Sequence, residues 1–132
     1  MPYVLDAHAP LWYLTADKKL SKRVRDTLDT TGDDLIIPAI ALAETGRIII
    51  SLRDGQQKFE ELLKAIDQDP RFRVVATDRQ IVETALRLQP LLELHDSLIL
   101  ATSIILNTRE ISAILLIRDE EIIKSKLTPT LW

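Results

Sequence analysis

Tyr3-Val4-Leu5-Asp6 is the stretch around which the fold of this 132-residue chain is organised. Three apolar residues lead directly into an acid, and a short apolar run of this kind predicts a buried strand. An acid at its carboxyl end would lie where a parallel sheet meets solvent, which is the edge at which open α/β sheets bind ligands. An acid in this place also commonly caps the next helix, so one such stretch leaves both interpretations open.

The same pattern recurs along the chain. Residues Ala113 to Ile117 form a second apolar run, which Arg118 and Asp119 follow, and short apolar runs over 35–37 and 72–75 predict two more strands. Helical spacing, capping residues and helix-breaking residues predict helices between the strands. In the first half of the chain these cover about 8–16, a segment capped by Ser21, and 39–52. Further helices carry Phe59, Leu62, Leu63 and Ile66, begin at Thr77 and Gln80 and run to about Leu88 before Pro90, cover 97–106 up to Asn107, and follow Asp119 as a short segment. Alternation of strands and helices predicts a single α/β domain over 1–132, with three α/β/α layers and a central parallel sheet of four to five short strands.

The amino-acid composition limits the kinds of site that this chain can form. The chain has no cysteine and only two histidines, His8 and His95, which excludes a disulfide scaffold and argues against a structural zinc site. No apolar stretch is long enough to span a bilayer and no secretory signal opens the chain, so we expect a cytoplasmic protein without a membrane partner. The net charge of −3 does not indicate nucleic-acid binding, but local basic patches can act within an acidic chain.

Two acids lie inside strongly apolar helical stretches. Glu44 stands between Ile40 and Ile48 on one helix face, where burial without a partner costs several kcal/mol, and Arg47 is the simplest partner. Asp96 precedes the most apolar helix of the chain. The simplest interpretation of Asp96, as of Asp119, is a helix N-cap.

Asp6, Glu44, Asp96 and Asp119 nevertheless share one feature. Each lies at the carboxyl end of a predicted strand or early in a helix that packs on the sheet. Because these ends meet at one edge of a parallel sheet, the four carboxylates could converge, and they would then need a counter-charge. With so few nitrogen and sulfur ligands in the chain, Mg²⁺ or Mn²⁺ is the simplest one.

These residues carry a family resemblance. Residues 5–12 (LDAHAPLW) resemble the opening of PIN domains of the VapC toxin type, and residues 38–44 resemble the helix that carries their glutamate. Residues 95–101 are similar to their third motif, residues 116–119 resemble the fourth, and the closing Trp132 also fits. The resemblance covers the whole chain.

The resemblance implies a metal-dependent endoribonuclease that is the toxin of a type II toxin–antitoxin pair. Asp6, Glu44, Asp96 and Asp119 would bind Mg²⁺ or Mn²⁺ and carry catalysis, with Glu93 as a weaker candidate ligand. Metal-assisted attack of water on phosphorus would leave a 5′-phosphate and a 3′-hydroxyl. The implied partners are an RNA substrate, a cognate antitoxin and a second copy of the chain.

Three departures from the family pattern leave an alternative open. Ala7 and Ile117 stand where threonines are usual, and Ser97 stands where an arginine is common. A catalytically degenerate PIN-like protein that acts only as a binding module is therefore the second hypothesis, although retention of all four acids favours the enzyme. A phosphoaspartate receiver would need paired acids after an early strand, and a haloacid-dehalogenase phosphatase would need an acid where His8 stands.

Histidines, basic residues and some apolar residues indicate function less specifically than the four acids do. Lone histidines such as His8 and His95 most simply pack or donate hydrogen bonds. The basic run after the first helix is either a path for RNA or solvated surface, and it contains Lys18, Lys19, Lys22, Arg23 and Arg25; Arg47 and Arg118 lie closer to the acids in sequence. Apolar residues that could face a second copy, or fill the core instead, are Trp12, Tyr13, Ile48, Ile49 and Ile50.

Overall fold

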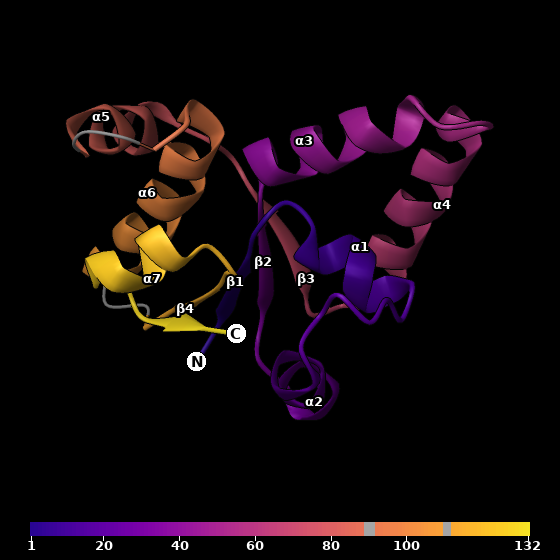
Figure 1. The fold of residues 1–132 in the computed structure, drawn as a ribbon, viewed down its shortest axis with the longest axis horizontal. Coiled ribbons are helices and arrows are strands. Elements are labelled where there is room, and N and C mark those ends of the chain that lie inside the picture. Colours follow the sequence, from indigo (N-terminus) through magenta and orange to yellow (C-terminus); the bar gives the residue numbers. More distant parts are fainter. Residues whose placement is uncertain (89–91, 110–111) are drawn as a thin grey trace.

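The computed structural model describes residues 1–88, 92–109 and 112–132, which form a parallel sheet flanked by helices (Figure 1). The predicted stop at Pro90 lies outside the described residues. The strands are β1 (Tyr3–Leu5), β2 (Leu35–Pro38), β3 (Phe72–Val75), β4 (Ile114–Leu116) and β5 (Thr130–Leu131). The helices are α1 (Ala9–Leu14), α2 (Lys22–Thr30), α3 (Ala39–Ile50), α4 (Gly55–Gln68), α5 (Arg79–Arg87), α6 (Leu94–Thr108) and α7 (Glu120–Ser125).

β1 lies in the centre of the sheet. The strand order is β3-β2-β1-β4-β5, and every pair of neighbours is parallel. In register, Tyr3 stands beside Leu35 of β2 on one side and Ile114 of β4 on the other. Figure 1 shows α6 and α7 on one side of the strands and α1 and α4 on the other, which confirms the three-layer α/β/α fold.

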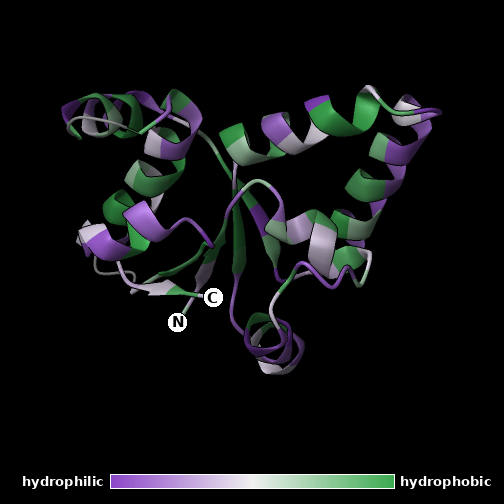
Figure 2. Cartoon of the chain, viewed as in Figure 1, coloured by the Kyte–Doolittle hydropathy of each residue, from purple (hydrophilic) through white to green (hydrophobic). Residues whose placement is uncertain are grey.

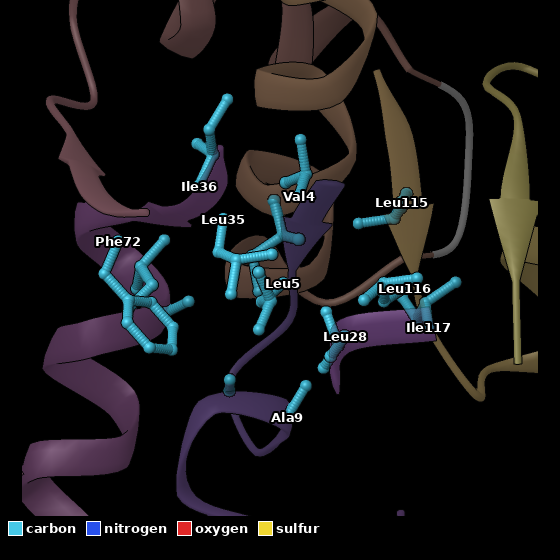
Figure 3. Close-up of a cluster of buried hydrophobic side chains, with 14 of the residues drawn as sticks. Val4, Leu5, Ala9, Leu28, Leu35, Ile36, Phe72, Leu115, Leu116 and Ile117 are labelled. Atoms are coloured by element: carbon cyan, nitrogen blue, oxygen red, sulfur yellow. The ribbon is translucent and has the colours of Figure 1, made fainter. Parts of the chain in front are cut away.

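The core is built from the strands and the helix faces turned toward them. Val4, Leu5, Leu35, Leu115 and Leu116 are fully inaccessible to solvent. Figure 3 shows these side chains gathered with residues of α2 and β3, and Figure 2 shows apolar strands between helices of mixed hydropathy. Burial of each such side chain is worth roughly 1.5–3 kcal/mol, so the central strands are the stable platform of the molecule.

The boundaries of α5 and α6 show how the helices differ from the sequence expectations. Asp78, not Thr77, caps α5, because its carboxylate accepts a hydrogen bond from Ile81 N at 3.0 Å. α6 begins at Leu94 rather than Ser97, so Asp96 lies within the first turn and is not the cap. The same helix continues past Asn107, whose side-chain amide donates to the carbonyl of Ala113 at 3.1 Å and so ties α6 to the residue that precedes β4.

A sharp corner joins α3 to α4. Asp54 has a left-handed backbone conformation, with φ of 55°, and Gly55 opens α4 directly after it. A Cβ at Gly55 would meet the carbonyl oxygens of Ile49 and Ile50 and the Cα of Ile50 at 2.5 Å, so only glycine fits without a shift of the α3 backbone. Within the described part of the chain, no helix is long and apolar enough to cross a membrane.

Candidate active site

Three of the predicted acids lie near the edge of the parallel sheet where the strands have their carboxyl ends. Asp6 directly follows β1, Glu44 lies on the helix that starts as β2 ends, and Asp119 follows β4 by three residues. Carboxyl ends of parallel strands share one edge of the sheet. α6 packs against α3 and brings Asp96 to the same region in its first turn.

Asp6 is half-buried at the end of β1. Burial raises the pKa of its carboxyl group from 3.8 to about 6, while nearby His8 and hydrogen bonds from the backbone of Ala9 and His8 oppose that rise. The negative charge of Asp96 adds to the rise in the pKa. One of the opposing bonds runs from Ala9 N to Oδ1 of Asp6 over 3.4 Å, so Asp6 also supports the start of α1.

Asp96 is the acid most affected by other acids. Burial raises its pKa first, His95 lowers it, and the negative charges of Asp119, Glu44 and Glu93 raise it further. With the influence that Asp96 has on Asp6, all the acids predicted for the site lie within electrostatic reach of this one carboxylate. The structure therefore gathers an excess of negative charge around Asp96.

His95 lies among three of these carboxylates. Its Nε2 atom is 3.2 Å from Oε1 of Glu44, 3.4 Å from Oδ1 of Asp96 and 3.5 Å from Oε2 of Glu93. Glu44 thus contacts His95 rather than Arg47, which is exposed. The sequence alone suggested only a packing or hydrogen-bonding role for His95, and the signal it offered was its place immediately before Asp96.

Glu44 keeps one oxygen without a partner. Its Oε2 atom is buried, and among the described residues it accepts no hydrogen bond. A buried, unsatisfied carboxylate oxygen costs free energy unless a cation completes it. Candidate ligand atoms of Glu93, His95 and Asp96 lie within 4.8 Å of one another, and Glu44 contacts His95. Their carboxylate oxygens are the ligands that a hard divalent cation such as Mg²⁺ or Mn²⁺ prefers.

Asp119 caps α7. Its Oδ1 atom accepts hydrogen bonds from Glu121 N at 2.8 Å and Ile122 N at 3.3 Å, so the capping interpretation holds for this acid. Both bonds use the same oxygen, and the second carboxylate oxygen takes no part in the cap. Asp119 can therefore serve as a cap and still act electrostatically on Asp96.

The positions that depart from the family pattern are all buried. Ala7, Ser97 and Ile117 are 5%, 6% and 2% exposed. The buried hydroxyl of Thr45 donates a hydrogen bond to the carbonyl of Ala7, one residue after Asp6. Sequence patterns did not single out Thr45, since a lone threonine inside an apolar helix carries no signal of its own.

Aromatic and basic groups pack around Trp12 on α1, the helix that follows Asp6. The ring of His8 stacks on Trp12 with centroids 5.3 Å apart, Trp132 packs edge-on against Trp12 at 6.1 Å, and Nζ of Lys19 lies 5.9 Å from the Trp12 ring. The C-terminal residue is thereby held against α1.

The basic run is not uniform. Lys22 pairs with Asp26 at 2.6 Å, and Arg25 donates to the carbonyl of Asp17 at 2.6 Å, so both act within the protein. Lys18, Lys19 and Arg23 are exposed.

Solved structures share this fold. VapBC2 from Rickettsia felis bound to a DNA fragment from their promoter has a TM-score of 0.74 and 14% identity, with 99% of this chain and 98% of that chain covered. VapBC-1 from nontypeable Haemophilus influenzae has a TM-score of 0.73 and 15% identity, with 99% and 97% covered. FitAcB from Neisseria gonorrhoeae has a TM-score of 0.70 and 18% identity, with 98% and 96% covered.

At these identities the likeness establishes the architecture rather than the activity. Comparison with curated proteins gives no significant match. The sequence model of the PIN domain matches residues 3–125, nearly the whole chain, and the protein therefore belongs to the PIN domain family.

Proposed function

We propose that this protein is a Mg²⁺- or Mn²⁺-dependent endoribonuclease and the VapC-type toxin of a type II toxin–antitoxin pair. The observation that carries the proposal is the buried, unpartnered Oε2 of Glu44 within a group of carboxylates whose charges raise the pKa of Asp96. A bound cation would relieve the repulsion among these carboxylates. A single domain over residues 1–132 carries the activity, which acts on RNA in the cytoplasm.

The acids fall into two groups in this proposal. Asp6, Glu44, Asp96 and Asp119 hold the cation, and Glu93, which is more exposed, is an outer ligand. A cation bound there lowers the pKa of water and stabilises negative charge on the scissile phosphate. The half-buried carboxyl of Asp6 is held by the Ala9 backbone, and the cap at α7 fixes Asp119, so both are oriented before substrate arrives.

A partner protein is part of the proposal. Solved structures of VapBC and FitAB share the fold, and two of them contain DNA fragments. This likeness supports the proposal that the chain binds a cognate antitoxin. A groove of about 420 Å³ between α3 and α4 offers an apolar site for it, lined by Ala39, Leu42, Ala43, Gly46, Arg47, Ile50, Gln56 and Phe59.

We also propose a homodimer. Ile49 belongs to the core, but Ile48 and Ile50 on either side of it are each 44% exposed. Light scattering at micromolar concentration should give twice the mass of one chain, and a monomer throughout that range would exclude the dimer.

The enzyme is tested by cleavage of an RNA panel with and without Mg²⁺ or Mn²⁺. Wild-type protein should cleave only with metal and leave 5′-phosphate ends. Asp6→Asn, Glu44→Gln and Asp96→Asn should each reduce turnover by at least a hundredfold, because each removes a charge from the cation site. Asp67→Asn, which removes an exposed acid on α4, is the matched control and should cleave like wild type. Metal-independent cleavage, or full activity of Asp6→Asn, would exclude this assignment and favour the binding module.

A further inference from the structure

The side chain of His95 lies among the carboxylates of the candidate metal site. Nε2 lies 3.2–3.5 Å from carboxylate oxygens of three residues, Glu44 on α3, Glu93 just before α6 and Asp96 within it. In octahedral coordination with bonds of about 2.1 Å, neighbouring ligand atoms stand about 3 Å apart. Nε2 of His95 and a carboxylate oxygen from each of Glu93 and Asp96 all lie within 4.8 Å of one another, so these three residues are placed to share one ion, with Glu44 beside them.

We propose that Nε2 of His95 is itself a ligand of the divalent cation, and that it makes the site selective for Mn²⁺ over Mg²⁺. The proposal rests on the metal-dependent function proposed above and adds to it a nitrogen ligand beside the carboxylates. Neutral imidazole offers one lone pair, and Nε2 is the nitrogen that faces the carboxylates.

The selectivity follows from ligand chemistry. Mg²⁺ prefers oxygen ligands and gives up its waters reluctantly, whereas transition ions accept imidazole nitrogen readily. A site of carboxylates alone would serve both ions. A nitrogen among the oxygens adds affinity for Mn²⁺ and adds little for Mg²⁺.

The competing role for His95 is that of a positive hydrogen-bond donor. A protonated ring at these distances would neutralise part of the carboxylate charge, and it would be displaced when a cation binds. The two roles make opposite predictions about the metal-loaded protein, since only a ligand leaves a nitrogen nucleus bonded to the ion.

Pulsed electron paramagnetic resonance of bound Mn²⁺ distinguishes them. The chain has two histidines, so in tag-free His8→Ala protein His95 is the only one left. With ¹⁵N-labelled histidine, this variant should show a bonded-nitrogen coupling that changes from the ¹⁴N to the ¹⁵N pattern. In His95→Gln the coupling should disappear, the dissociation constant for Mn²⁺ should rise about tenfold or more, and that for Mg²⁺ should change little.

The outcomes separate this inference from the proposed function. A bound Mn²⁺ signal without nitrogen coupling in His8→Ala would assign His95 to the hydrogen-bonding role and overturn the inference, while the carboxylate site would stand. Equal losses of Mn²⁺ and Mg²⁺ affinity in His95→Gln would overturn the selectivity. Absence of any bound Mn²⁺ in wild type would overturn the metal site on which both depend. Circular dichroism of His95→Gln checks that α6 remains folded.

Discussion

Burial at position 6 opposes the charge that a cation would need there. The pKa of Asp6 is raised from 3.8 to about 6, so folding disfavours its ionised form. Metal-free wild type should therefore lose stability as the pH rises from about 4 to about 6 and stay less stable above that. Asp6→Asn removes this cost and should be more stable than wild type at pH 7 by roughly 1–3 kcal/mol, with no advantage at pH 3.5.

Urea unfolding with a chelator present measures this difference. Asp67→Asn should match wild type at both pH values, because its carboxylate is exposed. Added Mg²⁺ or Mn²⁺ should reverse the order by stabilising wild type more than Asp6→Asn. An equal effect of Asp6→Asn at pH 3.5 and pH 7 would mean that the charge at position 6 carries no cost.

Single residues show where sequence reasoning succeeds and where it stops. Asp6 and Asp119 could be nominated because each follows an apolar run at a strand end, a pattern written in neighbouring residues. The contact of Glu44 with His95 could not, because these residues are 51 positions apart and meet only through the packing of α3 on α6. Sequence distance favours Arg47 as the partner of Glu44, and this prediction is wrong because the Arg47 side chain is exposed.

At the scale of helices and strands, the α3–α4 corner tolerates little change. Gly55→Ala should destabilise the protein by roughly 2–4 kcal/mol, because the added methyl group meets backbone atoms at 2.5 Å that no rotamer change can move. Gly32→Ala is the control, since a Cβ there meets nothing within 4 Å. It should change stability by less than about 1 kcal/mol.

Thermal unfolding of the two variants checks this contrast. If both variants unfold at the same temperature, the corner is not a close approach. The corner also fixes the far end of the helix that carries Glu44, so any activity of Gly55→Ala should be read at a temperature where the variant is folded.

Elements with an apolar run or helical spacing could be predicted, and the two-residue β5 could not. The buried runs that became β1, β2 and β4 are read from apolar residues alone. β5 has only two residues, too few to show any alternation, and exists because Leu115 and Leu116 offer it partners. The start of α6 was misplaced by three residues because its first apolar position, Leu94, is exposed and the helix packs from Ser97 onward.

Across the whole molecule, charge is unevenly distributed. Acids gather at the carboxyl edge of the sheet, while Lys18 and Lys19 are exposed between α1 and α2. If they follow the RNA backbone, replacing both with alanine should weaken RNA binding and reduce the log–log salt slope by about 1.4, since each single-strand phosphate contact contributes about 0.7. Turnover at saturating RNA should change little, because the acids are untouched.

The matched control replaces Lys58 and Lys64, which are exposed on α4. That pair carries the same charge on a different helix, so its loss should leave the salt slope near the wild-type value. If wild type and both double variants have equal salt slopes, the basic run is solvated surface. Arg47 and Arg118 are then the next candidates for contact with RNA.

The packing of Trp132 against Trp12 has an optical consequence. These are the only two tryptophans in the chain, and they lie 6.1 Å apart beside the ring of His8, two residues after Asp6. Indole emission from this protein therefore originates at one place, where the last residue meets the first helix. Excitation at the red edge of the indole band therefore gives an unlabelled, local signal for release of Trp132 from α1 and for events near His8.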